Sequence, residues 1–200
     1  VNLIATDNIP AYLTYVPGSL NITAGANLGT KTDATGDDQA DYISTGTPRV
    51  VFRLGTGANA TNGGQLPYLS STTFQFDTTV NAGVPAGTIL TNEVQVQYSG
   101  QTIGDTFAAS SAAATATVLG PPTISKSFSP SVIDVGAAST MSITVANPAG
   151  NPGTLNNVTF SDTYPAGLVN AATPNAQVNC TPGGTAGTIT GGAAAGNTVG

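Results

Sequence analysis

The 200-residue chain has no histidine, no tryptophan, one cysteine and one methionine. Without histidine, and with a single cysteine, it cannot form a Ser-His-Asp triad, a zinc site of His and Cys ligands or a haem attachment site. It also has no run approaching ~18 consecutive apolar residues, which excludes a helix that spans a bilayer. These absences remove the usual catalytic centres, and we expect the protein not to be an enzyme.

Charged residues are scarce as well. The chain has 4 Lys and Arg residues, 10 Asp and Glu residues and a formal net charge of −6. Charged residues make up 7% of the chain, against roughly a quarter in ordinary soluble domains. A chain with so few basic residues and a net negative charge has no basic surface that could bind nucleic acid or an anionic membrane, so we expect neither as a partner.

What the chain has in quantity is alternation between apolar and polar residues. Four segments show it, at 50–54, 74–77, 94–98 and 141–145. Each is typical of a strand with one buried face. Turn-forming runs rich in the 25 glycines and 13 prolines separate the strands, and no segment keeps a helical period. Many short strands with such turns predict an all-β sandwich.

An internal repeat suggests the domain organisation. The segment N-L-I-A-T-D-N-I-P-A-Y-L at 2–13 matches N-V-T-F-S-D-T-Y-P-A-G-L at 157–168. In this alignment Asp7 corresponds to Asp162. A Pro-containing linker at Gly120-Pro121-Pro122 predicts a boundary between a domain at 1–120 and a second at 121–200.

In this repeat frame both domains are incomplete. The segment 121–156 has no counterpart before Val1, so the first domain is expected to lack its opening strands and the second its closing half. We expect the chain to be cut out of frame from a longer repetitive protein. An incomplete sandwich exposes strand edges and apolar faces. Either another copy donates the missing strands, which would build a homopolymer, or the chain is a truncated piece of a multidomain protein.

Several motifs resemble a known family of bacterial surface repeats. They are P-T-I-S-K-S-F-S-P, T-M-S-I-T-V-A-N-P and V-T-F-S-D-T-Y-P-A-G-L in the second domain, and L-T-Y-V-P-G-S-L, V-N-A-G-V-P-A-G-T and I-L-T-N-E-V-Q-V-Q-Y-S-G in the first. The sequence is similar to the conserved repeat domain catalogued as domain of unknown function eleven, which has relatives among pilin isopeptide domains. The resemblance implies tandem immunoglobulin-like β-sandwiches, export to the bacterial cell surface, and a structural role in stalks, adhesins or filaments.

Polar residues on the apolar faces of strands are the candidate site. Lys126 shares a face with Ile124 and Phe128, and Asn92, Asp162 and Asp7 also lie on apolar faces. Lysine and aspartate are rarely buried unless paired. Burial lowers the pKa of a lysine and raises that of an aspartate, and a neutral amine is a nucleophile.

The resemblance implies one use of these residues. In the pilin relatives a Lys, an Asp and an Asn form a Lys–Asn isopeptide bond with loss of ammonia. Lys126, Asn92 and either Asp7 or Asp162 match those positions. Because Asp7 and Asn92 belong to the first domain and Lys126 to the second, a complete set would need Lys126 to enter another chain. The alternative is a hydrogen-bonded Lys–Asp–Asn cluster, or a lysine that reaches solvent.

Four acidic residues fall in one loop. Carboxylates close together in a Gly-containing loop can bind calcium, which is the one cofactor that the sequence suggests. The spacing does not match the helix–loop–helix calcium pattern, so a solvated acidic loop is the alternative. The four residues are Asp33, Asp37, Asp38 and Asp41.

Two kinds of modification are also suggested. Asn21, Asn59, Asn157 and Asn179 each begin an N-x-S/T triplet, which marks a glycan acceptor in a secreted protein but is common by chance in a Thr- and Asn-rich chain. Cys180 is the single cysteine. It is expected either to form a disulfide with a partner beyond this sequence, in an oxidising compartment, or to be a buried free thiol.

The function that these patterns favour is an extracellular structural protein. End-to-end β-sandwich repeats with strand exchange would form a surface filament, pilus-like fibre or adhesin stalk. The alternative is a carbohydrate- or protein-binding module of a large adhesin, with a ligand held by an exposed loop at 25–47 or 55–68.

Overall fold

The computed structural model describes all residues except 101, 103, 181–195, 197 and 200. The described part is all-β and contains no helix, and every strand pair is antiparallel. This confirms the predicted all-β class, and the layered antiparallel sheets fit a β-sandwich. The chain divides into two compact units, which we call unit 1 (Val1–Gly120 and Gly150–Pro152) and unit 2 (Pro121–Ala149 and Gly153–Gly200).

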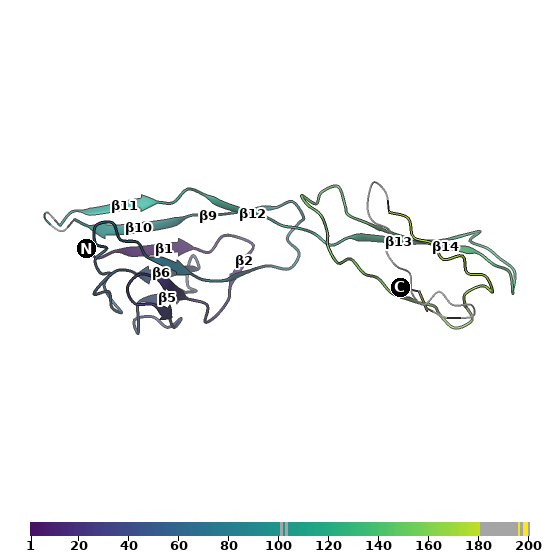
Figure 1. The fold of residues 1–200 in the computed structure, drawn as a ribbon, viewed down its shortest axis with the longest axis horizontal. Helices are drawn as coiled ribbons and strands as arrows, with labels where there is room; N and C mark the ends of the chain where they lie inside the picture. The colour runs from purple at the N-terminus through teal and green to yellow at the C-terminus, as the bar shows by residue number, and fades with distance from the viewer. Residues whose placement is uncertain (101, 103, 181–195, 197, 200) are drawn as a thin grey trace. The chain divides into compact units, whose positions relative to one another are not determined.

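Unit 1 is built on a five-stranded sheet with strand order β11-β10-β1-β6-β5 (Figure 1). The sheet is formed by β1 (Ile4–Asn8), β5 (Ala40–Ile43), β6 (Arg49–Arg53), β10 (Val94–Ser99) and β11 (Thr106–Ser110). The predicted strands at 50–54 and 94–98 are therefore present as β6 and β10. The central strand, β1, pairs with β6 on one side and with β10 on the other.

Three smaller sheets complete unit 1. In the first, β2 (Leu13–Tyr15) pairs with β8 (Thr78–Val80). The second has the order β4-β3-β7, with β3 (Asn21–Ala24), β4 (Gly29–Thr30) and β7 (Thr73–Gln75). The third pairs β9 (Ile89–Asn92) with β12 (Ala114–Thr117).

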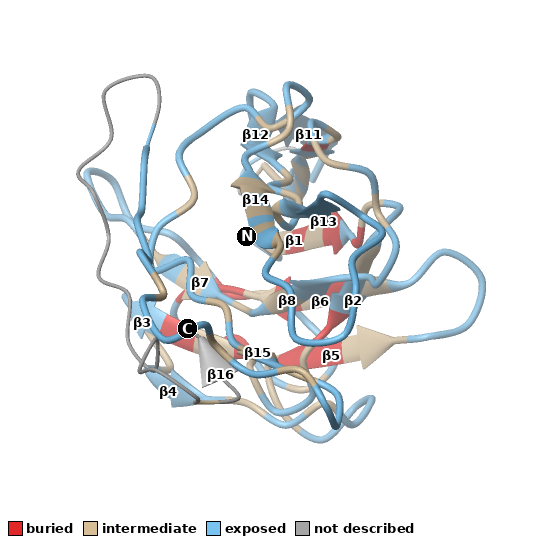
Figure 2. Ribbon diagram, turned by 90° about the vertical axis from the view of Figure 1, so that its right-hand side faces the viewer, coloured by how far each residue is buried: buried red, intermediate tan, exposed pale blue. Residues whose placement is uncertain are grey.

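The core of unit 1 lies between the five-stranded sheet and the strands β2, β3 and β7. Phe52 of β6 is fully buried, and its ring lies 4.5 Å from that of Phe74 on β7. Tyr15 of β2 stacks on Tyr42 of β5 at 4.2 Å. Buried residues accordingly lie on β1, β5 and β6 (Figure 2). Aromatic pairs of this kind add to the free energy gained by burying the rings.

The described part of unit 2 has strands but no buried centre. Its β13 (Thr123–Ser129) and β14 (Thr140–Ala146) pair over seven residues, and β15 (Asp162–Thr163) pairs with β16 (Thr198–Val199). None of the residues described in unit 2 is buried. The alternation predicted at 141–145 is visible in β14, where intermediate and exposed residues alternate, but the better-covered face still contacts solvent.

A buried ion pair ties β5 to β6 in unit 1. Arg53 donates through Nη2 to the Asp41 carboxylate, and the two side chains are 12% and 2% exposed. Removal of one partner of such a pair leaves an uncompensated buried charge, which typically costs several kcal/mol.

We therefore expect Arg53→Leu to lower the free energy of unfolding by about 3–5 kcal/mol. The matched control is Arg49→Leu at the other end of β6, where the guanidinium bonds only to the carbonyl oxygen of Thr47 and the change should stay within ~0.5 kcal/mol. Urea denaturation followed by tyrosine fluorescence measures both. Equal losses for the two variants would contradict a specific role of the Arg53–Asp41 pair.

Candidate functional site: a buried carboxylate beside an open groove

Asp7 points into unit 1 from the central strand. Alternate residues of β1 face the core, so Asp7 follows Ala5 on the buried face, and the two residues are 5% and 1% exposed. Its neighbours across the sheet are Val50 on β6 and Val94 on β10. A carboxyl group is thus held among valines, as the alternation of β1 predicts.

The Asp7 carboxyl group accepts one side-chain hydrogen bond among the described residues, although its two oxygens could accept several. Asn92 donates from Nδ2 to Asp7 Oδ2 at 2.8 Å. The other oxygen, Oδ1, is buried and has no hydrogen-bond partner in the described part of the chain. Burial raises the pKa of Asp7 above its ordinary value of 3.8, and the hydrogen bond from Asn92 offsets part of that rise. The group is therefore desolvated without a compensating cation.

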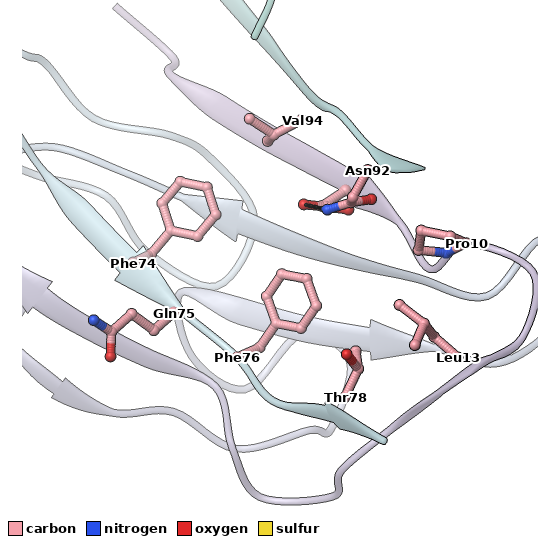
Figure 3. Close-up of a pocket in the computed structure, with 9 residues that line it drawn as sticks. Pro10, Leu13, Phe74, Gln75, Phe76, Thr78, Asn92 and Val94 are labelled. Carbon is pink, nitrogen blue, oxygen red and sulfur yellow. Dashed lines mark hydrogen bonds between the residues drawn. The ribbon is translucent and has the colours of Figure 1, made fainter. Parts of the chain in front are cut away.

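Asp7 and Asn92 border an open cavity (Figure 3). One pocket has a volume of about 460 Å³ and a second of about 360 Å³, and the two share Pro10, Leu13, Thr78 and Asn92. We call the two pockets together the groove. Phe74 and Phe76 enter it from one side, facing Asn92 and Val94 on the other. The second pocket is lined by aliphatic residues of β8, β9 and β12, including Val80, Leu90 and Ala116.

The wall formed by β7 and β8 has a free strand edge. Residues 73–80 run antiparallel to residues 13–24, through β3–β7 and β2–β8, and Val16 N–H donates to Asp77 O at 3.0 Å between the two ladders. Among the described strands, β7 pairs only with β3 and β8 only with β2. Backbone groups on the other edge are therefore open to an added strand.

In unit 2 the repeat counterpart of Asp7 has a lysine as its partner. Lys126 of β13 donates from Nζ to Asp162 Oδ2 at 2.6 Å. The ammonium group also lies 6.0 Å from the ring centroids of both Phe128 and Tyr164. The ammonium therefore lies near two rings and against the carboxylate that matches Asp7 in the internal repeat.

The four predicted residues thus form two separate pairs. Asp7 contacts Asn92 within unit 1, and Lys126 contacts Asp162 within unit 2. Lys126 is not buried in this chain, because its side chain is 37% exposed and Ile124 on the same face is 64% exposed, as in the alternative of a lysine that reaches solvent. Alternation shows which face of β13 is apolar, but no described element of unit 2 buries that face.

Within the described residues, the four loop aspartates are not brought together into a group of metal ligands. In the described ranges, no group of three or more His, Cys, Asp or Glu side chains is placed to hold a metal ion. Each carboxylate accepts hydrogen bonds from the protein instead: Asp33 from Tyr15 and Gly18, Asp37 from Thr32, Asp38 from Thr32 and Ala40, and Asp41 from Gly36 and Arg53. Asp41 is a core residue of β5, so the predicted exposed loop at 25–47 is wrong over that strand.

A tyrosine–aspartate bond was missed by sequence reasoning. Tyr15 is 4% exposed and its hydroxyl donates to Asp33 Oδ1. Burial and this carboxylate raise the pKa of Tyr15 to about 12. The bond joins the segment after β4 to the core, which explains why Asp33 is not available as a solvated ligand. No spacing rule connects residues 15 and 33, so the sequence carried no signal for it.

The remaining candidates lie at the surface. Asn21 is half-buried on β3, and Asn59, Asn157 and Asn179 are exposed. Asn59 Oδ1 accepts hydrogen bonds from Thr61 and Asn62, which closes its loop. Cys180 is exposed, so the expectation of a buried free thiol is wrong, whereas the disulfide to a partner beyond this sequence stays a prediction.

Comparisons with known proteins give one match. Residues 122–200 match a family described as a domain of unknown function, DUF7933, which covers 79 of the 200 residues (200 − 122 + 1). No curated protein and no solved structure matches the chain. The described residues also contain no helix that is long and apolar enough to cross a membrane. The resemblance to surface repeats and pilin isopeptide domains stays a prediction.

The raised pKa of Asp7 predicts a pH dependence of stability. Because the folded carboxyl group binds its proton more tightly than the unfolded one, the free energy of unfolding falls as pH rises from about 3.8 through the folded-state pKa. We expect Asp7→Asn to melt about 3 °C higher than the wild type at pH 7 in dilute solution, and the difference to vanish near pH 3. Calorimetry at both pH values measures this. The exposed Asp105→Asn is the control, and equal pH profiles for Asp7→Asn and the wild type would contradict the prediction.

Calcium should leave stability unchanged. Since the carboxylates of Asp33, Asp37, Asp38 and Asp41 already accept hydrogen bonds from the protein, the melting temperature should agree within ~1 °C in excess calcium and in excess chelator. Differential scanning fluorimetry measures it, with sodium chloride matched for ionic strength. A calcium-specific rise that Asp37→Asn abolishes would overturn this assignment.

Proposed function

We propose that this chain is part of an extracellular structural protein of the bacterial cell surface. In this proposal, tandem immunoglobulin-like β-sandwich repeats join end to end and exchange strands between subunits. The assembly is a surface filament, pilus-like fibre or adhesin stalk. The resemblance to bacterial surface repeats and the scarcity of catalytic side chains support a mechanical role rather than a chemical one.

The observation that carries the proposal is the incomplete covering of both units. In unit 1 the groove opens beside a free strand edge and a buried carboxylate oxygen without a partner. In unit 2 no described residue is buried, and Val132 and Val135 are 87% and 107% exposed. Apolar faces and free edges of this kind mark interaction surfaces in a protein that stays in solution.

The strands β11 and β12 add a second line of support. Their sequences, T-F-A-A-S and A-T-A-T, contain no charged residue and no proline, and every residue in them is exposed. Monomeric β proteins usually protect such edges with lysine, proline or a covering loop. An edge without these features favours association through strands.

The proposal includes a covalent form of the same assembly. With Lys126 of one copy beside Asp7 and Asn92 of another, a neutral Nζ would attack Asn92 Cγ. The new bond is an amide, and Nδ2 leaves as ammonia after receiving a proton through Asp7. The desolvated Asp7 carboxyl, which already contacts Asn92, supports this role because a carboxyl with a raised pKa can hold and pass a proton.

A second candidate function is a carbohydrate- or protein-binding module of an adhesin. The observation in its favour is the segment between β6 and β7, where Tyr68 and Leu69 are 91% and 89% exposed. An exposed aromatic ring and an aliphatic side chain at a loop tip can stack on a sugar or anchor a partner protein.

We expect the purified chain to form elongated assemblies at high concentration. Negative-stain microscopy and sedimentation velocity detect them, because strand exchange raises the mass with concentration. If the isopeptide bond forms, part of the material should persist as dimers and larger species on denaturing gels, and each link should lower the mass by one ammonia.

Controls distinguish the covalent assembly from the non-covalent one, and the structural function from the binding module. Asn92→Ala should remove the denaturant-resistant species but not the fibres. Monomers at every concentration would contradict the structural proposal. Monomers that bind a glycan array, with binding lost in Tyr68→Ala, would support the binding module instead.

A further inference from the structure

We infer that the groove of unit 1 is the docking site for the β13–β14 hairpin of a second copy of this chain, with Lys126 Nζ of that copy placed against the carboxyl group of Asp7, which lines the groove. The inference rests on the proposed function and specifies its contact. Both units have a carboxylate at the same position of the internal repeat. In unit 2 this carboxylate, Asp162, accepts a hydrogen bond from Lys126, whereas in unit 1 Oδ1 of Asp7 has no hydrogen-bond partner among the described residues.

The first argument is the internal repeat. Asp7 and Asp162 occupy equivalent positions in the matched segments 2–13 and 157–168. Asp162 accepts a hydrogen bond from Lys126 of β13. If equivalent positions have equivalent surroundings, Asp7 lacks a lysine that a β13-like strand would carry. The groove beside Asp7 gives such a strand an entry path.

The second argument comes from the count of cations. The chain has 4 basic side chains, which are Lys31, Arg49, Arg53 and Lys126. Arg53 is committed to Asp41, and Arg49 bonds to the carbonyl oxygen of Thr47. Lys31 lies outside the strands, and Lys126 lies on β13 between two apolar neighbours on the same face, Ile124 and Phe128, which are 64% and 38% exposed. A strand of that pattern can place an ammonium group inside an apolar groove.

The third argument is the match in shape and surface. The β13–β14 ladder has seven residue pairs, and the free-edged segment 73–80 has eight residues, so the two have nearly equal length. The apolar face of β14, formed by Met141, Ile143 and Val145, is only half covered in unit 2. In the groove it would meet Phe74 and Phe76 (Figure 3). Apolar area then supplies the free energy of association, and the lysine selects the register.

Cross-linking of mixed isotopes tests the contact directly. Full-length chains grown in ¹⁴N and ¹⁵N medium are mixed, treated with a zero-length carbodiimide and digested for mass spectrometry. We expect peptides that join Lys126 to Asp7 with one light and one heavy partner. Cross-links of Lys126 to Asp162 alone, or Lys126–Asp7 links only within one isotope, would overturn the inference.

Matched variants test the energetics by sedimentation velocity. Asp7→Asn keeps the shape of the side chain and a hydrogen bond with Asn92 but removes the charge, and we expect association to weaken at least 10-fold. Lys126→Met should weaken it similarly, with Lys126→Arg as the charge-retaining comparison. The control is Asp162→Asn, which removes the partner of Lys126 in its own unit, and association should be retained or strengthened.

The outcomes separate this inference from the broader proposal. Circular dichroism and the melting temperature of each variant show whether the fold is kept. If wild-type fibres form and both Asp7→Asn and Lys126→Met associate as the wild type does, the docking site is wrong while the filament proposal stands. If the wild type remains monomeric at every concentration, both are wrong.

Discussion

A β-sheet with an apolar face needs something to cover that face, and the described part of this chain meets the requirement only in part. Around Leu20 and Phe52 the covering is complete, with both side chains at 0% exposure. Beside Asp7 it ends in the groove. In unit 2 the described residues have no buried centre at all. The free strand edges, the carboxylate oxygen without a partner and the exposed face of β13 all follow from this shortage of covering strands among the described residues.

The small number of charges makes each ion pair informative. In a chain with 4 basic groups, the Arg53–Asp41 pair fixes β5 to β6 and the Lys126–Asp162 pair fixes β13 near β15. Asp7 is also buried, at 5% exposure against 1% for Asp41, but among the described residues it has only the amide of Asn92 as its partner. A buried carboxyl group without a cation shifts toward its protonated form, which explains the raised pKa.

Alternation in the sequence predicted local structure well. The predicted segments 50–54, 94–98 and 141–145 correspond to β6, which ends at Arg53, and to β10 and β14, and Asp7 faces inward on β1. The segment 74–77 is less regular, because β7 ends at Gln75 and β8 begins at Thr78, opposite the turn that follows β2. Period-two patterns report the direction of side chains, which is a local property of a strand.

The sequence could not predict the contacts between residues that are far apart along the chain. Whether Lys126 is buried depends on a covering strand, and the burial of Asp41 depends on Arg53, twelve residues further on. Ala40 and Asp41 are both buried although they are neighbours, so β5 breaks the alternation that would have revealed it. The donors to the carboxylates of the acidic loop could not be predicted for the same reason, since several of them, such as Tyr15 and Arg53, come from other parts of the chain.

In the proposed docking, the two carboxylates that compete for Lys126 would gain different amounts of free energy from it. A partly exposed pair such as Lys126–Asp162 is typically worth ~0–1 kcal/mol, because water screens it and two side chains must be ordered. A buried oxygen without a partner costs about 1–3 kcal/mol, so the transfer of the lysine to Asp7 relieves a larger penalty than it incurs at Asp162. The lysine must also lose its own water, which cancels much of that gain. The net free energy of docking therefore has to come from apolar contact of β13 and β14 with the groove. The Lys126–Asp7 ion pair would disfavour every alignment of the hairpin in the groove that leaves Asp7 unpaired.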